Sequence, residues 1–188
     1  MRHVISALVM NEPGVLAGVA NMFSARGFNI DSLVVGRTED PALSRMTIVV
    51  IGDDLTLDQV RKQLAKLVPV VSVRDFKDAA YVERDLALIT LGVGTDQRGA
   101  VIEIVNLFRG RVVDVAPDSL TVELAGTEQK IEAFIDLMRP YNIKETARTG
   151  VIAMARGSQP EKAAAGGTPG GKRVRSLDAP AAAALPPS

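Results

Sequence analysis

Residues 3–27 read HVISALVMNEPGVLAGVANMFSARG, and this stretch sets the architecture of the first half of the chain. The run from His3 to Met10 is mostly apolar, as expected of a strand. From Val15 onward the apolar residues recur three and four positions apart, which is the spacing of one buried helix face, and Gly27 provides a helix stop. The chain is therefore predicted to begin with a strand, a tight turn and a helix.

Two strands, a second helix and a further strand are predicted next. Thr56 and Gln59 have the spacing of a capping box, which predicts a helix that begins there and ends near Pro69. The predicted strands are rich in Val, Ile and Thr and cover residues 28–38, 45–52 and 70–76. The first half therefore has the order βαββαβ.

The same order repeats in the second half. Asp96 is the candidate N-cap of a helix that Gly110 closes, and Thr127 introduces a second helix that Pro140 ends. The predicted strands cover residues 85–93, 112–115 and 119–124, with a closing strand region within 142–155. In this arrangement two helices cover one face of a four-stranded antiparallel sheet.

The predicted fold is thus α+β, with two tandem ferredoxin-like βαββαβ domains and a tail. The predicted boundaries are residues 1–77 for the first domain, 78–83 for a linker, 84–156 for the second domain and 157–188 for the tail. Gly, Pro and Ala dominate the tail, so burial of apolar groups cannot offset the entropy cost of ordering it, and we predict that it is disordered. Its basic cluster at 172–175 is expected to be solvated, or to contact a partner weakly.

Composition and charge exclude several classes of function. Twenty-two basic and twenty-two acidic residues cancel, so no long-range field would attract nucleic acid or an anionic membrane. The chain has no cysteine and a single histidine, His3, which excludes disulfides, thiolate catalysis and metal sites built from cysteines or several histidines. No apolar stretch is long enough to span a membrane, and no cleavable signal pattern precedes the first strand. We expect a cytoplasmic protein that binds neither nucleic acid nor membrane.

The turn Asn11-Glu12-Pro13-Gly14 is the strongest candidate binding site. Unpaired backbone N–H groups at a helix start attract anions, and the helix dipole contributes about 0.3 to 1 kcal/mol. Gly14 has no side chain to keep a ligand from the backbone, and Asn11 supplies hydrogen-bond donors and an acceptor. An ordinary strand-to-helix turn has the same spacing, so the residues by themselves leave both interpretations open.

Other patterns do not amount to a catalytic or cofactor site. Gly92 and Gly94 follow a strand, but Gln97 stands where the G-x-G-x-x-G motif requires its third glycine. Asp53 and Asp54 precede a helix and have no candidate partner base, so a turn and a helix N-terminus explain them better than catalysis does. The only histidine has no serine in a recognisable nucleophile motif to act on.

Several ordered motifs resemble one protein family. They are NEPGVL at 11–16, FSARGFNIDSL at 23–33, DPALSRMTI at 40–48, VERDL at 82–86, residues 104–114, LAGT at 124–127 and ARTGV at 147–151. From Met1 to about Gly157 the sequence resembles the small, regulatory subunit of acetohydroxyacid synthase, also called acetolactate synthase. Its first domain resembles an ACT domain. The tail is unlike the family.

The resemblance implies a non-catalytic partner of a large, thiamine-diphosphate-dependent subunit, which joins pyruvate to a second 2-ketoacid in branched-chain amino acid synthesis. It implies that the chain raises this activity, confers feedback inhibition by valine and binds no cofactor, while thiamine diphosphate, FAD and Mg belong to the catalytic subunit. In similar proteins two ACT domains pair side by side as a homodimer, and the amino acid binds where the helix-start loop of one chain meets the start of a strand in the other. The matching positions here are Asn11, Gly14, Val15, Leu16, Asn29 and Ile30.

These residue types suit valine. The helix start can hold the ligand carboxylate, and Asn11 and Asn29 can meet its polar groups. Val15, Leu16 and Ile30 can enclose a branched side chain, whose full burial is worth about 1.5 to 3 kcal/mol. A site shared by two chains would link ligand binding to subunit arrangement through a population shift.

Two other interpretations stay open. The first domain alone would permit a free-standing ACT-type amino-acid sensor that controls another enzyme or transcription, although the motifs of the second domain argue against it. An enzyme in its own right is the other, for which neither half supplies a convincing nucleophile, a metal site or an intact cofactor motif.

Overall fold

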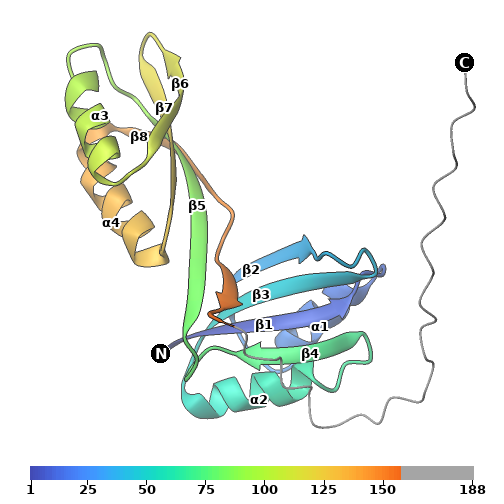
Figure 1. Ribbon diagram of the computed structural model, residues 1–188. Coiled ribbons are helices and arrows are strands. Elements are labelled where there is room, and N and C mark those ends of the chain that lie inside the picture. The colour runs from blue at the N-terminus through green and yellow to red at the C-terminus, as the bar shows by residue number, and fades with distance from the viewer. Residues whose placement is uncertain (158–188) are drawn as a thin grey trace, which may run out of the picture.

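A computed structural model describes residues 1–157 of the chain (Figure 1). Two antiparallel sheets are present, and two helices accompany each of them, which confirms the predicted α+β class. Apart from Gly157, the predicted disordered tail and its basic cluster lie outside the described residues. No helix in the described range is long and apolar enough to cross a membrane.

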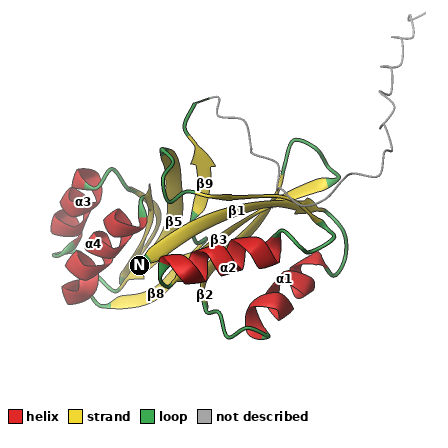
Figure 2. Ribbon diagram, turned by 90° about the horizontal axis from the view of Figure 1, so that it is seen from below, coloured by secondary structure: helices red, strands yellow, loops and turns green. Residues whose placement is uncertain are grey.

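The first domain follows the predicted order. Its elements are β1 (Arg2–Met10), α1 (Val15–Ser24), β2 (Ile30–Arg37), β3 (Leu43–Ile51), α2 (Asp54–Leu64) and β4 (Val70–Asp75). The sheet has the strand order β2-β3-β1-β4, and both helices lie on one of its faces (Figure 2). Alternate residues of β1, namely Ile5, Ala7 and Val9, are buried against Val19 and Phe23 of α1 and their neighbours in one apolar core.

The second domain repeats this arrangement and adds one strand. Its elements are β5 (Tyr81–Leu91), α3 (Arg98–Leu107), β6 (Arg111–Ala116), β7 (Ser119–Gly126), α4 (Glu128–Met138), a 3₁₀ turn (Arg139–Tyr141), β8 (Ile143–Arg148) and β9 (Ile152–Ala155). Four strands are ordered β6-β7-β5-β8, and β9 pairs with β5 outside that path. Ile89 of β5, Val105 of α3 and Phe134 of α4 lie in its separate apolar core.

Two predicted helix caps are wrong. The N-cap of α2 is Asp53, whose carboxylate accepts hydrogen bonds from the Thr56 backbone N–H at 2.8 Å and from the Thr56 hydroxyl at 2.7 Å. Asp53 has the extended backbone that an N-cap needs, so Thr56 is a partner of the cap and not the cap itself. The N-cap of α3 is Gln97. Asp96 lies in the preceding turn, in which the Gln97 backbone N–H donates to the Gly94 carbonyl at 3.2 Å.

The closing strand region predicted within 142–155 consists of two strands. β8 pairs with Ala87–Leu91, whereas β9 pairs with Tyr81–Arg84 at the other end of β5. Between them Gly150 has a φ of +82°, a left-handed conformation that ends the first strand. Residues 81–83 of the expected linker are therefore strand residues, because β9 supplies them with a partner.

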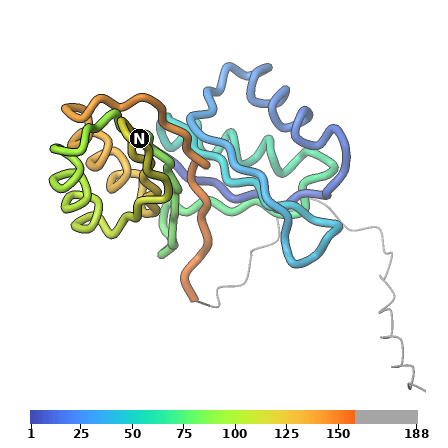
Figure 3. Tube along the Cα trace, turned by 90° about the horizontal axis from the view of Figure 1, so that it is seen from above, coloured from blue at the N-terminus to red at the C-terminus, as the bar shows by residue number. Residues whose placement is uncertain are grey.

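The ribbon formed by β5 and β9 packs on the face of the first sheet that the helices leave open. Val4, Val49 and Phe76 of the first domain are buried there against Val151 and Ala153 of the second. Figure 3 shows this terminal segment, in orange, running from the second domain onto the first. Arg2 of β1 adds ion pairs to Glu83 of β5 at 3.1 Å and to Glu128 of α4 at 2.5 Å. The two domains thus share an interface that contains both apolar contacts and ion pairs.

Candidate functional site

The turn before α1 leaves the start of the helix open. Gly14 is the N-cap of α1, with φ +87°, and no side chain caps the helix. A Cβ at Gly14 would meet no atom within 4 Å. The first turn of α1 also contains no acidic residue that would neutralise the positive end of the helix dipole. The Val15 N–H donates to the Glu12 carbonyl at 3.5 Å, so an anion at this turn would have to bind the N–H groups that follow it in the first turn of the helix.

The predicted site residues near the turn divide into three kinds. Asn11 fixes the turn to the β2–β3 loop, because its backbone N–H donates to the Ala42 carbonyl at 2.8 Å and its side-chain Nδ2 donates to the Pro41 carbonyl at 3.0 Å. Val15 is buried in the first core, with 7% exposure. Leu16 is 47% exposed and remains available to a ligand.

Asn29 and Ile30 lie at the opposite end of the same domain. Asn29 is exposed, and Ile30 is half-buried against the first core. On the shared neighbour β3, Met10 pairs with Leu43 whereas Ile30 pairs with Val50. At about 3.3 Å per residue, these seven residues separate the two groups by about 23 Å. One chain therefore does not bring the predicted site residues together.

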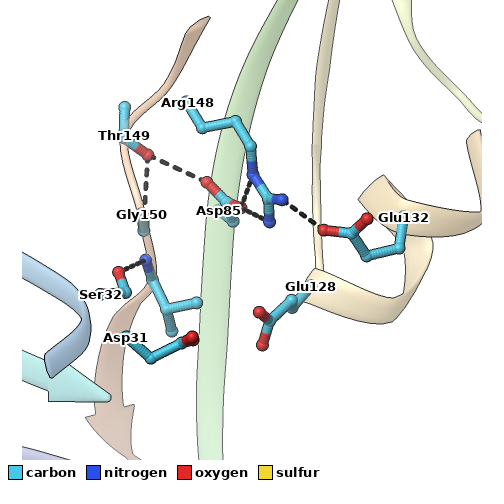
Figure 4. A pocket seen from close by; sticks show the side chains of 9 residues that line it. Asp31, Ser32, Asp85, Glu128, Glu132, Arg148, Thr149 and Gly150 are labelled. Carbon is cyan, nitrogen blue, oxygen red and sulfur yellow. Dashed lines mark hydrogen bonds and ion pairs between the residues drawn. The ribbon is translucent and has the colours of Figure 1, made fainter. Parts of the chain in front are cut away.

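A cavity of about 430 Å³ lies between the domains, and sequence reasoning missed it (Figure 4). Its lining comprises Asp31 and Ser32 of β2, Asp85 of β5, Glu128 and Glu132 of α4, and residues 148–151. In Figure 4 the carboxylates of Asp31 and Glu128, which come from different domains, point toward each other across it. The ARTGV motif at 147–151 could have indicated this cavity, because four of its residues line it. The motif contributed to the resemblance, but no role was assigned to it.

A buried ion pair forms one wall of this cavity. The Asp85 side chain has 0% exposure, and its Oδ2 accepts a hydrogen bond from Arg148 Nε at 2.9 Å. Arg148 also pairs with Glu132, and the Thr149 hydroxyl donates to Asp85 Oδ1 at 3.3 Å. Burial lowers the pKa of Arg148, but the hydrogen bonds and charges of Asp85 and Glu132 outweigh it and raise the pKa overall. The guanidinium therefore stays charged in this wall.

The acidic lining does not form a metal site. Within residues 1–157, no group of three or more His, Cys, Asp or Glu side chains is arranged to hold a metal ion. His3 is buried, and its Nε2 lies 3.2 Å from the Gly52 carbonyl, which gives the imidazole a structural contact.

The comparison with family models divides the chain at the same place as the two sheets. Residues 5–72 match the model described as "AHAS small subunit-like ACT domain". Residues 84–157 match the model described as "Small subunit of acetolactate synthase". Together these matches include all four helices of the described residues and most of each sheet.

Individual proteins agree with these matches over nearly their whole length. A protein of Archaeoglobus fulgidus named as a probable acetolactate synthase small subunit is 54% identical over 85% of this chain and 99% of its own length. One of Methanothermobacter thermautotrophicus with the same name is 51% identical over 84% of this chain and 94% of its own. The crystal structure of the acetolactate synthase small subunit from Thermotoga maritima superposes with a TM-score of 0.77 at 42% identity, covering 85% of this chain and 99% of that one. The chain therefore belongs to the family of acetolactate synthase small subunits.

Proposed function

We propose that this chain is the regulatory subunit of acetolactate synthase. In the cytoplasm it binds the thiamine-diphosphate-dependent catalytic subunit, raises its activity and confers feedback inhibition by valine. The chain carries out no catalytic step and holds no cofactor of its own. The observation that carries the proposal is the pair of half-sites at opposite ends of the first domain, in a chain whose relatives are named as small subunits of this enzyme.

The valine site is completed by a second copy of the chain. β2 is an edge strand of its sheet, and Val35 on it is 42% exposed. Arg37 pairs with Ser44, which pairs with Val9, so the end of β2 lies near the Gly14 turn. If two β2 strands pair antiparallel about a two-fold axis, the start of one strand meets the end of the other. Ile30 of one copy then lies near the Gly14 turn of the other copy, because that turn is at the end of β2.

Each half contributes a different part of the recognition. The N–H groups after Gly14 hold the carboxylate of valine, and the side-chain oxygens of Asn11 and Asn29 accept from its ammonium group. Leu16 and Ile30 enclose the branched side chain, while Val15, which is buried in the core, supports the turn from below. The apolar part of the site therefore comes from both copies of the chain.

Regulation follows from the shared site. Valine that contacts two copies favours the dimer arrangement that brings both halves close, so its binding shifts the population of subunit arrangements. The catalytic subunit responds to that shift, with a coupling of about 1 to 3 kcal/mol in typical allosteric systems.

The test is a valine titration of the catalytic subunit with and without this chain. Adding the chain should raise acetolactate formation from pyruvate and introduce inhibition by valine, and the chain alone should show no turnover. Sedimentation of the isolated chain should give the mass of a dimer. If the added chain conferred neither activation nor valine inhibition, the proposed function would be wrong.

A further inference from the structure

Strand β2 contains a β-bulge beside the proposed effector residues. Ile30 pairs with Val50, but Ser32 pairs with Val49, so Asp31 is an extra residue in the ladder. The bulge lies on an edge strand, which is held by hydrogen bonds to β3 on one side. A ligand that contacts Asn29 or Ile30 would therefore touch β2 directly beside the point where its register with β3 shifts by one residue.

The residue after the bulge touches the second domain. The Ser32 hydroxyl accepts a hydrogen bond from the Val151 backbone N–H at 3.4 Å. At Gly150, a Cβ would lie 2.5 Å from Ser32 Oγ and 3.0 Å from Val34 Cγ2. The turn approaches β2 this closely because residue 150 has no side chain, and its φ of +82° also favours glycine.

The same turn is firmly attached to the second domain. The Thr149 N–H donates to the Leu86 carbonyl at 3.0 Å, and the Leu86 N–H donates to the Thr149 hydroxyl at 3.2 Å. The preceding residue, Arg148, forms the buried ion pair with Asp85 and also contacts Glu132 of α4. A displacement of the turn is thus a displacement of β5 and α4.

We propose that the contact between Ser32 and the Gly150 turn transmits the effector signal from the first domain to the second. Contact of valine with Asn29 and Ile30 changes the bulge at Asp31, which moves Ser32 against the turn. The hydrogen bond from Val151 then carries the movement into β5 and α4. This inference rests on the proposed function, because it takes valine as the effector and inhibition of the catalytic subunit as the response.

The test uses Ser32→Ala, Gly150→Ala and the double variant in the reconstituted holoenzyme. Ser32→Ala removes only the accepting hydroxyl, whereas Gly150→Ala adds a Cβ that pushes the turn away from β2. Gly157→Ala is the matched control, since Gly157 has a φ of +71° but no atom within 4 Å of a Cβ. It introduces similar backbone strain without disturbing the contact.

Both single variants should raise the valine concentration for half-inhibition by about tenfold, within the range of ordinary allosteric couplings. Calorimetry on the isolated chain should show valine binding unchanged, and the catalytic subunit should still be activated. The double variant should be no worse than either single one, because both remove the same contact. Valine should also slow amide hydrogen exchange in residues 143–155 of the wild type but not of Ser32→Ala.

Each other outcome has a distinct meaning. Unchanged valine inhibition in both single variants would overturn the inference and leave the proposed function standing. Loss of valine binding itself would also overturn it, because the contact would then be part of the binding site. A wild-type chain that confers no valine sensitivity would instead remove the proposed function. If Gly150→Ala does not fold, Ser32→Ala decides alone.

Discussion

Gly14→Asp places a carboxylate at the open start of α1. No atom lies within 4 Å of a Cβ at this position, so the Cβ of the new side chain has open space around it. The φ of +87° strains any residue with a side chain, although Asn and Asp tolerate left-handed backbone better than most. Gly14→Asn is therefore the matched control, with the same backbone strain and nearly the same shape but no charge.

The expected effect follows from the separation of two like charges. A valine carboxylate at the first N–H groups of α1 would lie about 4 Å from the Asp carboxylate, which costs about 1 kcal/mol in bulk water and about 4 kcal/mol at an effective dielectric constant of 20. Gly14 is exposed, so screening by water favours the lower part of this range. Because about 1.4 kcal/mol is tenfold in affinity, the Kd of the Asp variant should exceed that of the Asn variant at least about fivefold.

Calorimetry of valine binding to both variants measures this ratio directly. In the reconstituted enzyme, Gly14→Asp should need at least about fivefold more valine for half-inhibition than Gly14→Asn, but it should still activate the catalytic subunit, since the turn is assigned to the effector and not to activation. Circular dichroism should show the same helix content in both variants. Equal valine affinities for the Asp and Asn variants would refute the placement of the carboxylate at this turn.

Three further predictions concern the structure that supports the site. Arg148→Gln leaves the buried Asp85 carboxylate without its cation and should lower the free energy of unfolding by about 3 kcal/mol in urea titrations, while a loss below about 1 kcal/mol would show that water screens the pair. Hydrogen bonds from the side chain and backbone of Thr56 lower the pKa of Asp53 below its ordinary value of 3.8, so its cap stabilises the fold above about pH 4 and is lost as the pH falls through the lowered pKa. Asp53→Asn keeps a capping side chain that does not titrate, so urea unfolding between pH 7 and pH 2 should show a steeper acid loss in the wild type, and parallel curves would contradict this. Phe76→Ala should lower the free energy of unfolding by about 3 kcal/mol and speed amide hydrogen exchange in β9. Unchanged exchange in β9 would mean that the interface between the domains does not depend on this ring.

Local patterns predicted the elements well because strands and helices bury residues with different periods. The apolar spacing after Val15 and the mostly apolar run of β1 both contribute residues to the first core. The helix caps were predicted less well, since several polar residues stood near each helix start and only backbone conformation selects between them. Asp53, with extended backbone, was selected over Thr56 for this reason.

The interface between the domains could not be predicted in the same way. The pairing of β9 with Tyr81–Arg84 joins residues about seventy positions apart, and no local period records such a contact. The residue type of Gly150 indicates a turn, but the proximity of Ser32 depends on how two sheets pack. Similarly, Asn11 was recognised as a polar residue of the turn, while its bond to Pro41 depends on the neighbouring loop.

The ribbon on the open face of the first sheet has a consequence for synthesis of the chain. The first sheet is complete once β4 ends at Asp75, but the strand that covers it ends at Ala155, eighty residues later. At about 5 to 20 residues per second, Val4, Val49 and Phe76 would stay uncovered on the ribosome for roughly 4 to 16 seconds. A nascent chain in that interval presents an apolar sheet face to chaperones and to other nascent chains. These contacts of the first domain should end when the last strand, β9, has been synthesised and covers the apolar face.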